Sequence, residues 1–93
     1  MNDDLSAMIR KAVNVLKSFG ATDVYLFGSI AKGTNTKYSD IDLAVTGIAP
    51  ENFYMAMGDT FGALKREIDI IDLDENTPFV EYLKSHGELQ RVE

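Results

Sequence analysis

The sequence contains no cysteine and only one histidine, His86. Without cysteine, the chain forms no disulfide and no thiolate metal centre. A single histidine directly before a glycine is more typical of a helix C-terminus than of a catalytic base. The composition therefore excludes disulfide frameworks and disfavours a site built on histidine.

Long hydrophobic runs are also absent. No apolar stretch approaches the about 20 residues that a membrane-spanning helix needs. The first four residues, Met-Asn-Asp-Asp, are acidic, unlike the start of a secretory signal. We therefore expect a cytoplasmic protein with no membrane contact.

Basic residues are scarce. The chain has 9 Lys and Arg against 15 Asp and Glu, which gives a formal net charge of −6. Affinity for nucleic acid comes largely from Lys and Arg side chains that neutralise phosphates. The charge balance disfavours nucleic acid as a partner and disfavours a polymerase acting alone.

What remains is ordinary globular composition, 45% hydrophobic and 26% charged over 93 residues. This length suits one domain, residues 1–93, with one core. Apolar residues at helical spacing predict helices over residues 4–19, 50–64 and 79–85, the last with Thr77 and Pro78 at its start. Gly58 and Gly62 lie four apart in the second of these helices; such a pair lowers regularity but can also permit close helix packing.

A buried strand is predicted over residues 23–27, ending in a tight Gly28-Ser29 turn. Residues 29–32 then form one helical turn closed by Gly33, and residues 34–38 form a polar surface loop. Gly28 lets the backbone approach a ligand closely, and the N–H groups of the turn suit an anion such as phosphate.

Two aspartates follow in a second apolar strand, predicted over residues 41–45. Residues two apart in a strand share a face, so Asp40 and Asp42 project together while Ile41 and Leu43 face the core. Two aligned carboxylates beside a phosphate cradle make a site for Mg²⁺ carrying a nucleoside triphosphate.

A third strand, predicted over residues 66–73, carries Asp69 and Asp72 on opposite faces. Only one of them can join the pair on the second strand, and its position favours Asp69. The alternative is that Asp40, Asp42 and Asp69 are solvated side chains at strand ends with no role in binding. This alternative is disfavoured because the three aspartates lie in the most apolar segments of the chain, where an unpaired charge is costly.

Three short motifs occur in a fixed order along the chain: Phe27-Gly28-Ser29, then Asp40-Ile41-Asp42-Leu43, then Ile68-Asp69-Ile70. Together they resemble the motifs of the nucleotidyltransferase superfamily that includes DNA polymerase β. The flanking residues are similar to those of the minimal nucleotidyltransferases, one-domain bacterial members often paired with a HEPN-domain partner. The resemblance covers about residues 13–83. It implies an α/β (α+β) fold with a small, mixed, mainly antiparallel sheet and helices packed on one face.

The resemblance also implies a mechanism. In it, the metal ligands for two Mg²⁺ ions are Asp40, Asp42 and Asp69. Asp40 and Asp42 hold Mg²⁺ that bridges the triphosphate, Gly28 and Ser29 bind its phosphates, and Asp69, with the second metal, orients and deprotonates an acceptor hydroxyl. Lys32 is the best cationic candidate for phosphate binding, although a solvated loop lysine explains it equally well.

The acceptor is left open by the residues themselves. The resemblance implies that AMP is transferred from ATP to a tyrosine of a HEPN ribonuclease toxin, which makes the chain its antitoxin. The alternatives are a non-catalytic binding module or nucleotide sensor that neutralises a partner by contact, and an enzyme that nucleotidylates a small molecule such as an aminoglycoside.

Overall fold

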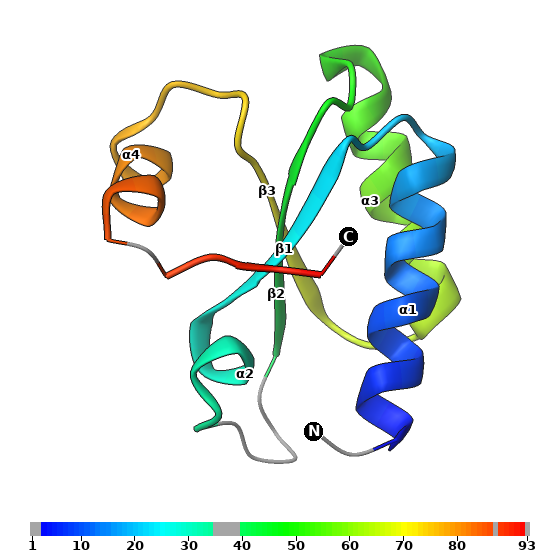
Figure 1. Ribbon diagram of the computed structural model, residues 1–93. Helices are drawn as coiled ribbons and strands as arrows, with labels where there is room; N and C mark the ends of the chain where they lie inside the picture. The colour runs from blue at the N-terminus through cyan, green and yellow to red at the C-terminus, as the bar shows by residue number, and fades with distance from the viewer. Residues whose placement is uncertain (1–2, 35–39, 87, 93) are drawn as a thin grey trace.

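A computed structural model describes residues 3–34, 40–86 and 88–92, and a four-stranded sheet lies at its centre (Figure 1). The strand order is β3-β2-β1-β4, with β1 antiparallel to β2 and β4 and with β2 parallel to β3. The prediction of a mixed, mainly antiparallel sheet is confirmed. The strands are β1 (Asp23–Phe27), β2 (Ile41–Thr46), β3 (Ile68–Asp72) and β4 (Gln90–Arg91).

The predicted helices form within one residue of their expected bounds. Local signals explain these ends: Pro50 occupies the first turn of the third helix, and the Thr77 hydroxyl accepts a hydrogen bond from the Val80 N–H (3.2 Å) at the start of the fourth. The helices are α1 (Asp3–Ser18), α2 (Gly28–Lys32), α3 (Pro50–Leu64) and α4 (Pro78–Ser85).

One face of the sheet is covered by α1 and α3, which lie on the right in Figure 1. Ile41 and Leu43 are fully buried on this face, as the alternation in β2 predicted. The helices contribute apolar side chains to the same core, among them Leu5, Ile9, Ala12, Leu16, Ala56 and Leu64.

The opposite face is covered in part by α4, so the expectation of helices on one face does not hold for α4. Val80 and Leu83 of α4 pack there with Phe27, Ala44 and Leu73. The physical reason is that the second face of the sheet also carries apolar side chains, among them Phe27 of β1, Ala44 of β2 and Ile71 of β3, and these need a cover.

The C-terminal segment returns to the sheet and pairs with β1 through the short β4. The Val92 N–H donates to the Val24 carbonyl (2.9 Å), and Arg91 lies 2.7 Å from a carboxylate oxygen of Asp23. Leu89 and Val92 are partly buried against the two cores. The third strand is shorter than the predicted residues 66–73.

No helix in the described parts of the chain is both long enough and apolar enough to cross a bilayer. The surface loop predicted over residues 34–38 falls outside the described residues except for Thr34, whose backbone N–H donates to the Ser29 carbonyl (3.0 Å).

Candidate active site

The chain turns sharply where β1 ends. Phe27 is extended, and Gly28 then adopts a φ of +74° as the first residue of α2. Positive φ of this kind is accessible to glycine at little cost. Gly33 closes α2 in the same left-handed region, with a φ of +75°. The predicted strand, turn and single helical turn are all present.

Gly28 is required for a second reason, which is its contact with Asp42. A Cβ built on Gly28 would overlap the Oδ2 atom of the Asp42 carboxyl. The contact arises because β1 and β2 are antiparallel and place Phe27 opposite Asp42. The turn after β1 and the first carboxylate of β2 are therefore packed directly on each other.

Asp42 also meets a carboxylate on its other side. β2 and β3 are parallel, and their register sets Asp42 against Asp69. Burial, the neighbouring charge of Asp69, a hydrogen bond with the Asp69 side chain and the charge of Asp40 together raise the pKa of Asp42 from 3.8 to about 6. The strand register brings together the two carboxylates that the sequence assigned to different strands.

Asp40 lies one residue before β2 and is exposed. Its charge is felt by Asp42, consistent with the shared face that alternation predicted. In the described parts of the chain, however, no three Asp, Glu or His side chains converge closely enough to hold a metal ion by themselves. The three aspartates thus form a close pair, Asp42 and Asp69, with Asp40 at its edge.

The donor set fits Mg²⁺. This ion prefers carboxylate oxygens and usually takes one or two of them together with phosphate oxygens and water. Crowded carboxylates whose mutual repulsion raises a pKa are stabilised when a cation joins them. A pair with a third carboxylate nearby matches an ion that arrives with a nucleotide better than a preformed three-ligand cage.

Asp72 lies at the far end of β3, away from this pair. Its Oδ1 accepts a hydrogen bond from the Asp74 N–H (2.9 Å), and the Asp74 carboxylate accepts one from the Gly47 N–H (2.8 Å). These contacts hold the turn that follows the strand. The preference for Asp69 over Asp72 as the third site carboxylate agrees with this placement.

Residues 9–90 match the nucleotidyltransferase domain family. The chain belongs to this family. The nucleotidyltransferase domain has no significant match among curated protein sequences. Its fold is similar to that of a chain in a crystal structure of a toxin–antitoxin complex with AMP-PNP, at a TM-score of 0.69 and 24% identity over 88% of this chain and 69% of that one.

Two further structures share the fold. One is described as a minimal nucleotidyltransferase and aligns at a TM-score of 0.69 and 21% identity over 99% of this domain and 96% of that chain. The other is a complex of a tri-AMPylated Shewanella oneidensis HEPN toxin with its MNT antitoxin, at a TM-score of 0.65 and 21% identity over 92% and 69% of the two chains. The predicted family and fold of the nucleotidyltransferase domain are confirmed.

Lys32 lies beside a carboxylate that the sequence did not indicate. Its Nζ lies 3.7 Å from the Glu88 carboxylate, and 56% of the Lys32 side chain is exposed. Nothing in the sequence pointed to Glu88, because the pair depends on the return of the C-terminal segment to β1. Glu88 is therefore a neighbour of Lys32 that only the fold reveals.

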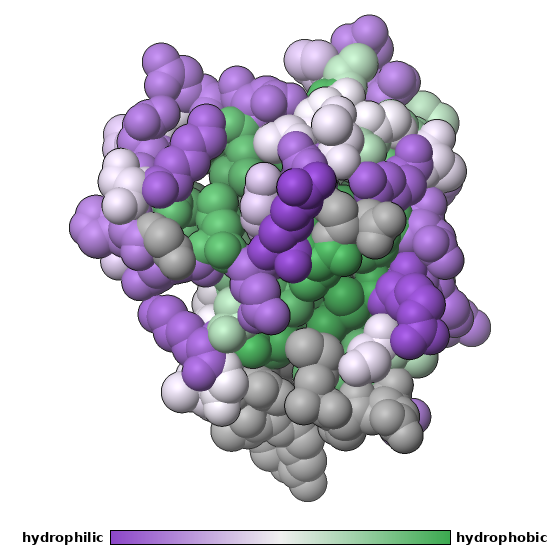
Figure 2. Space-filling model, in the orientation of Figure 1, coloured by the Kyte–Doolittle hydropathy of each residue, from purple (hydrophilic) through white to green (hydrophobic). Residues whose placement is uncertain are grey.

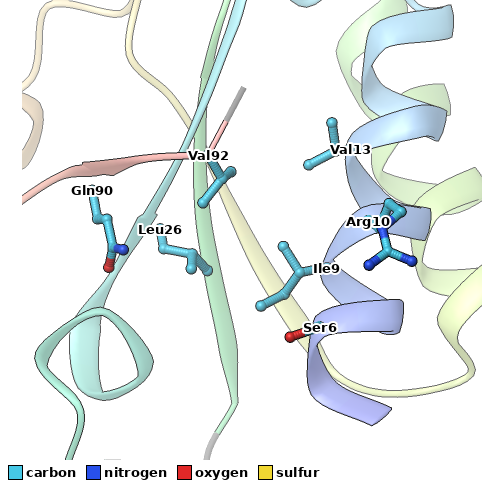
Figure 3. A pocket seen from close by; sticks show the side chains of 7 residues that line it. All are labelled: Ser6, Ile9, Arg10, Val13, Leu26, Gln90 and Val92. Atoms are coloured by element: carbon cyan, nitrogen blue, oxygen red, sulfur yellow. The ribbon is translucent and has the colours of Figure 1, made fainter. Parts of the chain in front are cut away.

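The site lies apart from a hollow of about 370 Å³ between α1 and the strands β1 and β4 (Figure 3). Its lining includes Ile9, Val13, Leu26 and Val92, with Arg10 at one side. Hydrophobic surface is visible in the middle of this face between hydrophilic side chains (Figure 2). None of the candidate site residues lines this hollow.

Proposed function

We propose that the domain transfers a nucleoside monophosphate, AMP from ATP, to a hydroxyl group with the aid of Mg²⁺. The observation that carries the proposal is the position of Asp42, which packs against Gly28 at the end of β1 and lies beside Asp69 of β3. Family membership supplies the reaction class, and the carboxylate pair supplies oxygen ligands where the turn offers backbone N–H groups.

Asp40 and Asp42 would hold the Mg²⁺ that accompanies the triphosphate, and Asp69 would complete the ligand set for a second ion. Bound Mg²⁺ neutralises the charge of the triphosphate and of the departing pyrophosphate. Because Asp42 is half-buried, its carboxylate acts where solvent screens charge less than in bulk water.

The chain's own residues then bind and orient. The backbone N–H groups at Gly28 and Ser29 donate to the β- and γ-phosphates, an arrangement that Gly28 permits because it has no Cβ. To bind the phosphates, the Lys32 ammonium must leave the Glu88 carboxylate. This costs little free energy, because exposed ion pairs contribute little to stability.

Asp69 accepts the proton of the acceptor hydroxyl, whose oxygen attacks the α-phosphorus. The bond from the α-phosphorus to the bridging oxygen breaks, and pyrophosphate leaves. Asp69 is exposed, so an acceptor outside the domain can reach it. The chemistry depends mainly on positioning and charge neutralisation and needs few side chains.

A protein acceptor fits best, namely a tyrosine of a HEPN toxin in the cytoplasm, with this domain as the antitoxin. The support is the similarity of the fold to an MNT antitoxin in complex with a tri-AMPylated HEPN toxin and to a toxin–antitoxin complex with AMP-PNP. ATP is the corresponding nucleotide donor.

Incubation with ATP labelled at the α-phosphate, Mg²⁺ and the HEPN-fold protein encoded beside this chain tests the proposal. We expect label on a tyrosine of that protein, no label when EDTA is present, and none with Asp42→Asn. A stable complex without label would indicate a binding module instead, and label on an aminoglycoside alone would place the domain among small-molecule nucleotidyltransferases.

The role of Asp69 has a separate test. Asp69→Asn should still bind Mg·ATP, because Asp40 and Asp42 remain, while transfer falls by about 10²–10⁴, the usual loss of a positioned base. Calorimetric titration of Mg·ATP beside the transfer assay separates binding from chemistry. If Asp69→Asn loses nucleotide affinity as completely as Asp40→Asn, then Asp69 helps to build the nucleotide site and is not the base.

A further inference from the structure

The aspartate site lies on the face of the sheet that α4 covers in part. Asp42 and Ala44 lie two apart in β2, so their side chains point to the same face of the sheet. Ala44 is fully buried there, in one apolar cluster with Val80 and Leu83 of α4. Helix α4, on the left of the sheet in Figure 1, is therefore the helix that borders the site along β2.

The start of α4 is fixed by local signals. Pro78 occupies its first turn, and the Thr77 hydroxyl accepts a hydrogen bond from the Val80 N–H (3.2 Å). Val80 points into the core and is 1% exposed. Phe79, one residue earlier, is turned by about 100° around the helix axis, and it is 47% exposed. The cap thus sets an aromatic ring at the edge of the buried side of α4.

The Phe79 ring lies beside the residue that leads into the site. Its centroid is 6.0 Å from that of the Phe27 ring, and the two rings meet at 67°. Phe27 directly precedes Gly28 and is the cross-strand partner of Asp42. Residues directly opposite each other in an antiparallel pair have their side chains on the same face. A single residue, Phe27, thus connects the Phe79 ring with Gly28 and Asp42.

Phe79 differs from the other large apolar side chains that are exposed in the described parts of the chain. Three of these belong to α3, on the other face of the sheet, namely Tyr54, Met55 and Phe61. The fourth, Tyr82, has its ring stacked on that of His86, with the centroids 4.3 Å apart. Phe79 is the exposed aromatic residue that adjoins the aspartate site.

The groups assigned so far to the nucleotide recognise only its charged part. Backbone N–H groups at Gly28 and Ser29, together with carboxylates and Mg²⁺, bind a triphosphate whatever base it carries. A nucleobase presents a flat π face, which stacks favourably on an aromatic side chain. Phe79 supplies such a ring at the border between the site and α4.

From this arrangement we propose that the Phe79 ring is the stacking platform for the base of the ATP that binds at Gly28, Asp42 and Asp69. The inference rests on the proposed function, since it requires a nucleotide at that site. The base then lies over the first turn of α4, and the triphosphate lies over the turn after β1. Stacking is available to every base, so Phe79 holds the base in place without selecting adenine over guanine.

Titration calorimetry with Mg·ATP and with Mg·tripolyphosphate separates contacts to the base from contacts to the phosphates. Phe79→Leu keeps an apolar side chain next to Phe27 and removes the aromatic ring. Loss of a stack between a base and an aromatic ring weakens binding by about 5- to 150-fold, and the dissociation constant of Mg·ATP should rise by a factor in this range. That of Mg·tripolyphosphate, which has no base, should stay unchanged. Phe79→Tyr keeps the ring and should bind both ligands like the unaltered chain.

Tyr82→Leu is the matched control. Tyr82 lies on the same helix and is 46% exposed, close to the 47% of Phe79, but its ring stacks on His86. This variant should bind Mg·ATP and Mg·tripolyphosphate like the unaltered chain. Unchanged binding of Mg·tripolyphosphate by Phe79→Leu also shows that the phosphate-binding turn is still folded in that variant.

The outcomes distinguish the base contact from the proposed function. Equal affinity of the unaltered chain and Phe79→Leu for Mg·ATP would overturn the base contact and leave the proposed function standing. The same conclusion follows if Phe79→Leu loses affinity equally for both ligands, or if Tyr82→Leu loses as much affinity for Mg·ATP. A chain that binds neither ligand would overturn the proposed function and, with it, the stacking of a base on Phe79.

Discussion

Replacing Gly28 by alanine is the sharpest test of how the site is built, because the chain contains its own control. Gly28 and Gly33 have nearly identical φ angles, +74° and +75°. A Cβ at Gly28 overlaps the Asp42 carboxyl, whereas a Cβ at Gly33 meets no atom within 4 Å among the described residues. Alanine at either position therefore meets the backbone strain of a positive φ, but only Gly28→Ala also introduces an overlap with the Asp42 carboxyl.

The expected magnitudes follow from these two terms. Alanine in the left-handed region costs about 1–2 kcal/mol, partly offset by the lower entropy of the unfolded chain, so Gly33→Ala should lose about 1 kcal/mol of unfolding free energy. Gly28→Ala adds the overlap with Asp42, whose carboxyl is held by Asp69 and cannot swing away freely. Overpacking of this kind costs about 1–3 kcal/mol, giving a total loss of about 2–4 kcal/mol.

Urea unfolding of both variants, followed by circular dichroism, measures the difference. The Gly28→Ala change should cost only about 1 kcal/mol when it is made in an Asp42→Ala background, because the overlap is then gone. Equal losses for Gly28→Ala and Gly33→Ala would refute the reasoning. So would a Gly28→Ala loss that is unaffected by removal of the Asp42 side chain.

Three further results are expected. The pKa of Asp42 is raised in the folded state, so the folded protein binds this proton more tightly than the unfolded chain. Without metal, its melting temperature should fall as the pH rises from about 4 to about 6, and Asp42→Asn should flatten that slope. Thr77→Ala removes the hydrogen bond to the Val80 N–H and should cost about 1 kcal/mol in urea unfolding, with α4 otherwise intact. Leu83 is 2% exposed, so Leu83→Ala should cost about 2–5 kcal/mol by the same measurement; a loss below 1 kcal/mol would mean that α4 is not part of the core.

The elements could be predicted because their signals are local. The apolar run at residues 24–27 ends at Gly28, and the structure ends β1 at Phe27. Likewise, the alternation around Ile41 and Leu43 set the buried face of β2 correctly. The candidate pair Asp42 and Asp69 needed one more fact, the parallel register of β2 and β3, which no local pattern contains.

The position of α4 could not be derived from its own sequence. An amphipathic pattern predicts that one side of a helix packs on an apolar surface, but it does not predict which face of the sheet supplies that surface. Ala44 and Leu43 are both fully buried on opposite faces of β2, so either face offered an apolar surface. The pairing of Lys32 with Glu88 has the same origin, since it depends on where the chain goes after α4.

The order of the strands also has a consequence for the kinetics of folding. β1 and β2 are neighbours in the chain and α3 links β2 to β3, but β4 pairs with β1 across most of the sequence, as the contact of Tyr25 with Arg91 shows. Contacts between distant segments carry the largest loop-closure cost and tend to form late. Substitutions in β4 should therefore speed unfolding while leaving the refolding rate nearly constant. During synthesis, the strands that carry Asp42 and Asp69 emerge, and can pair, before the segment that completes the sheet beside them.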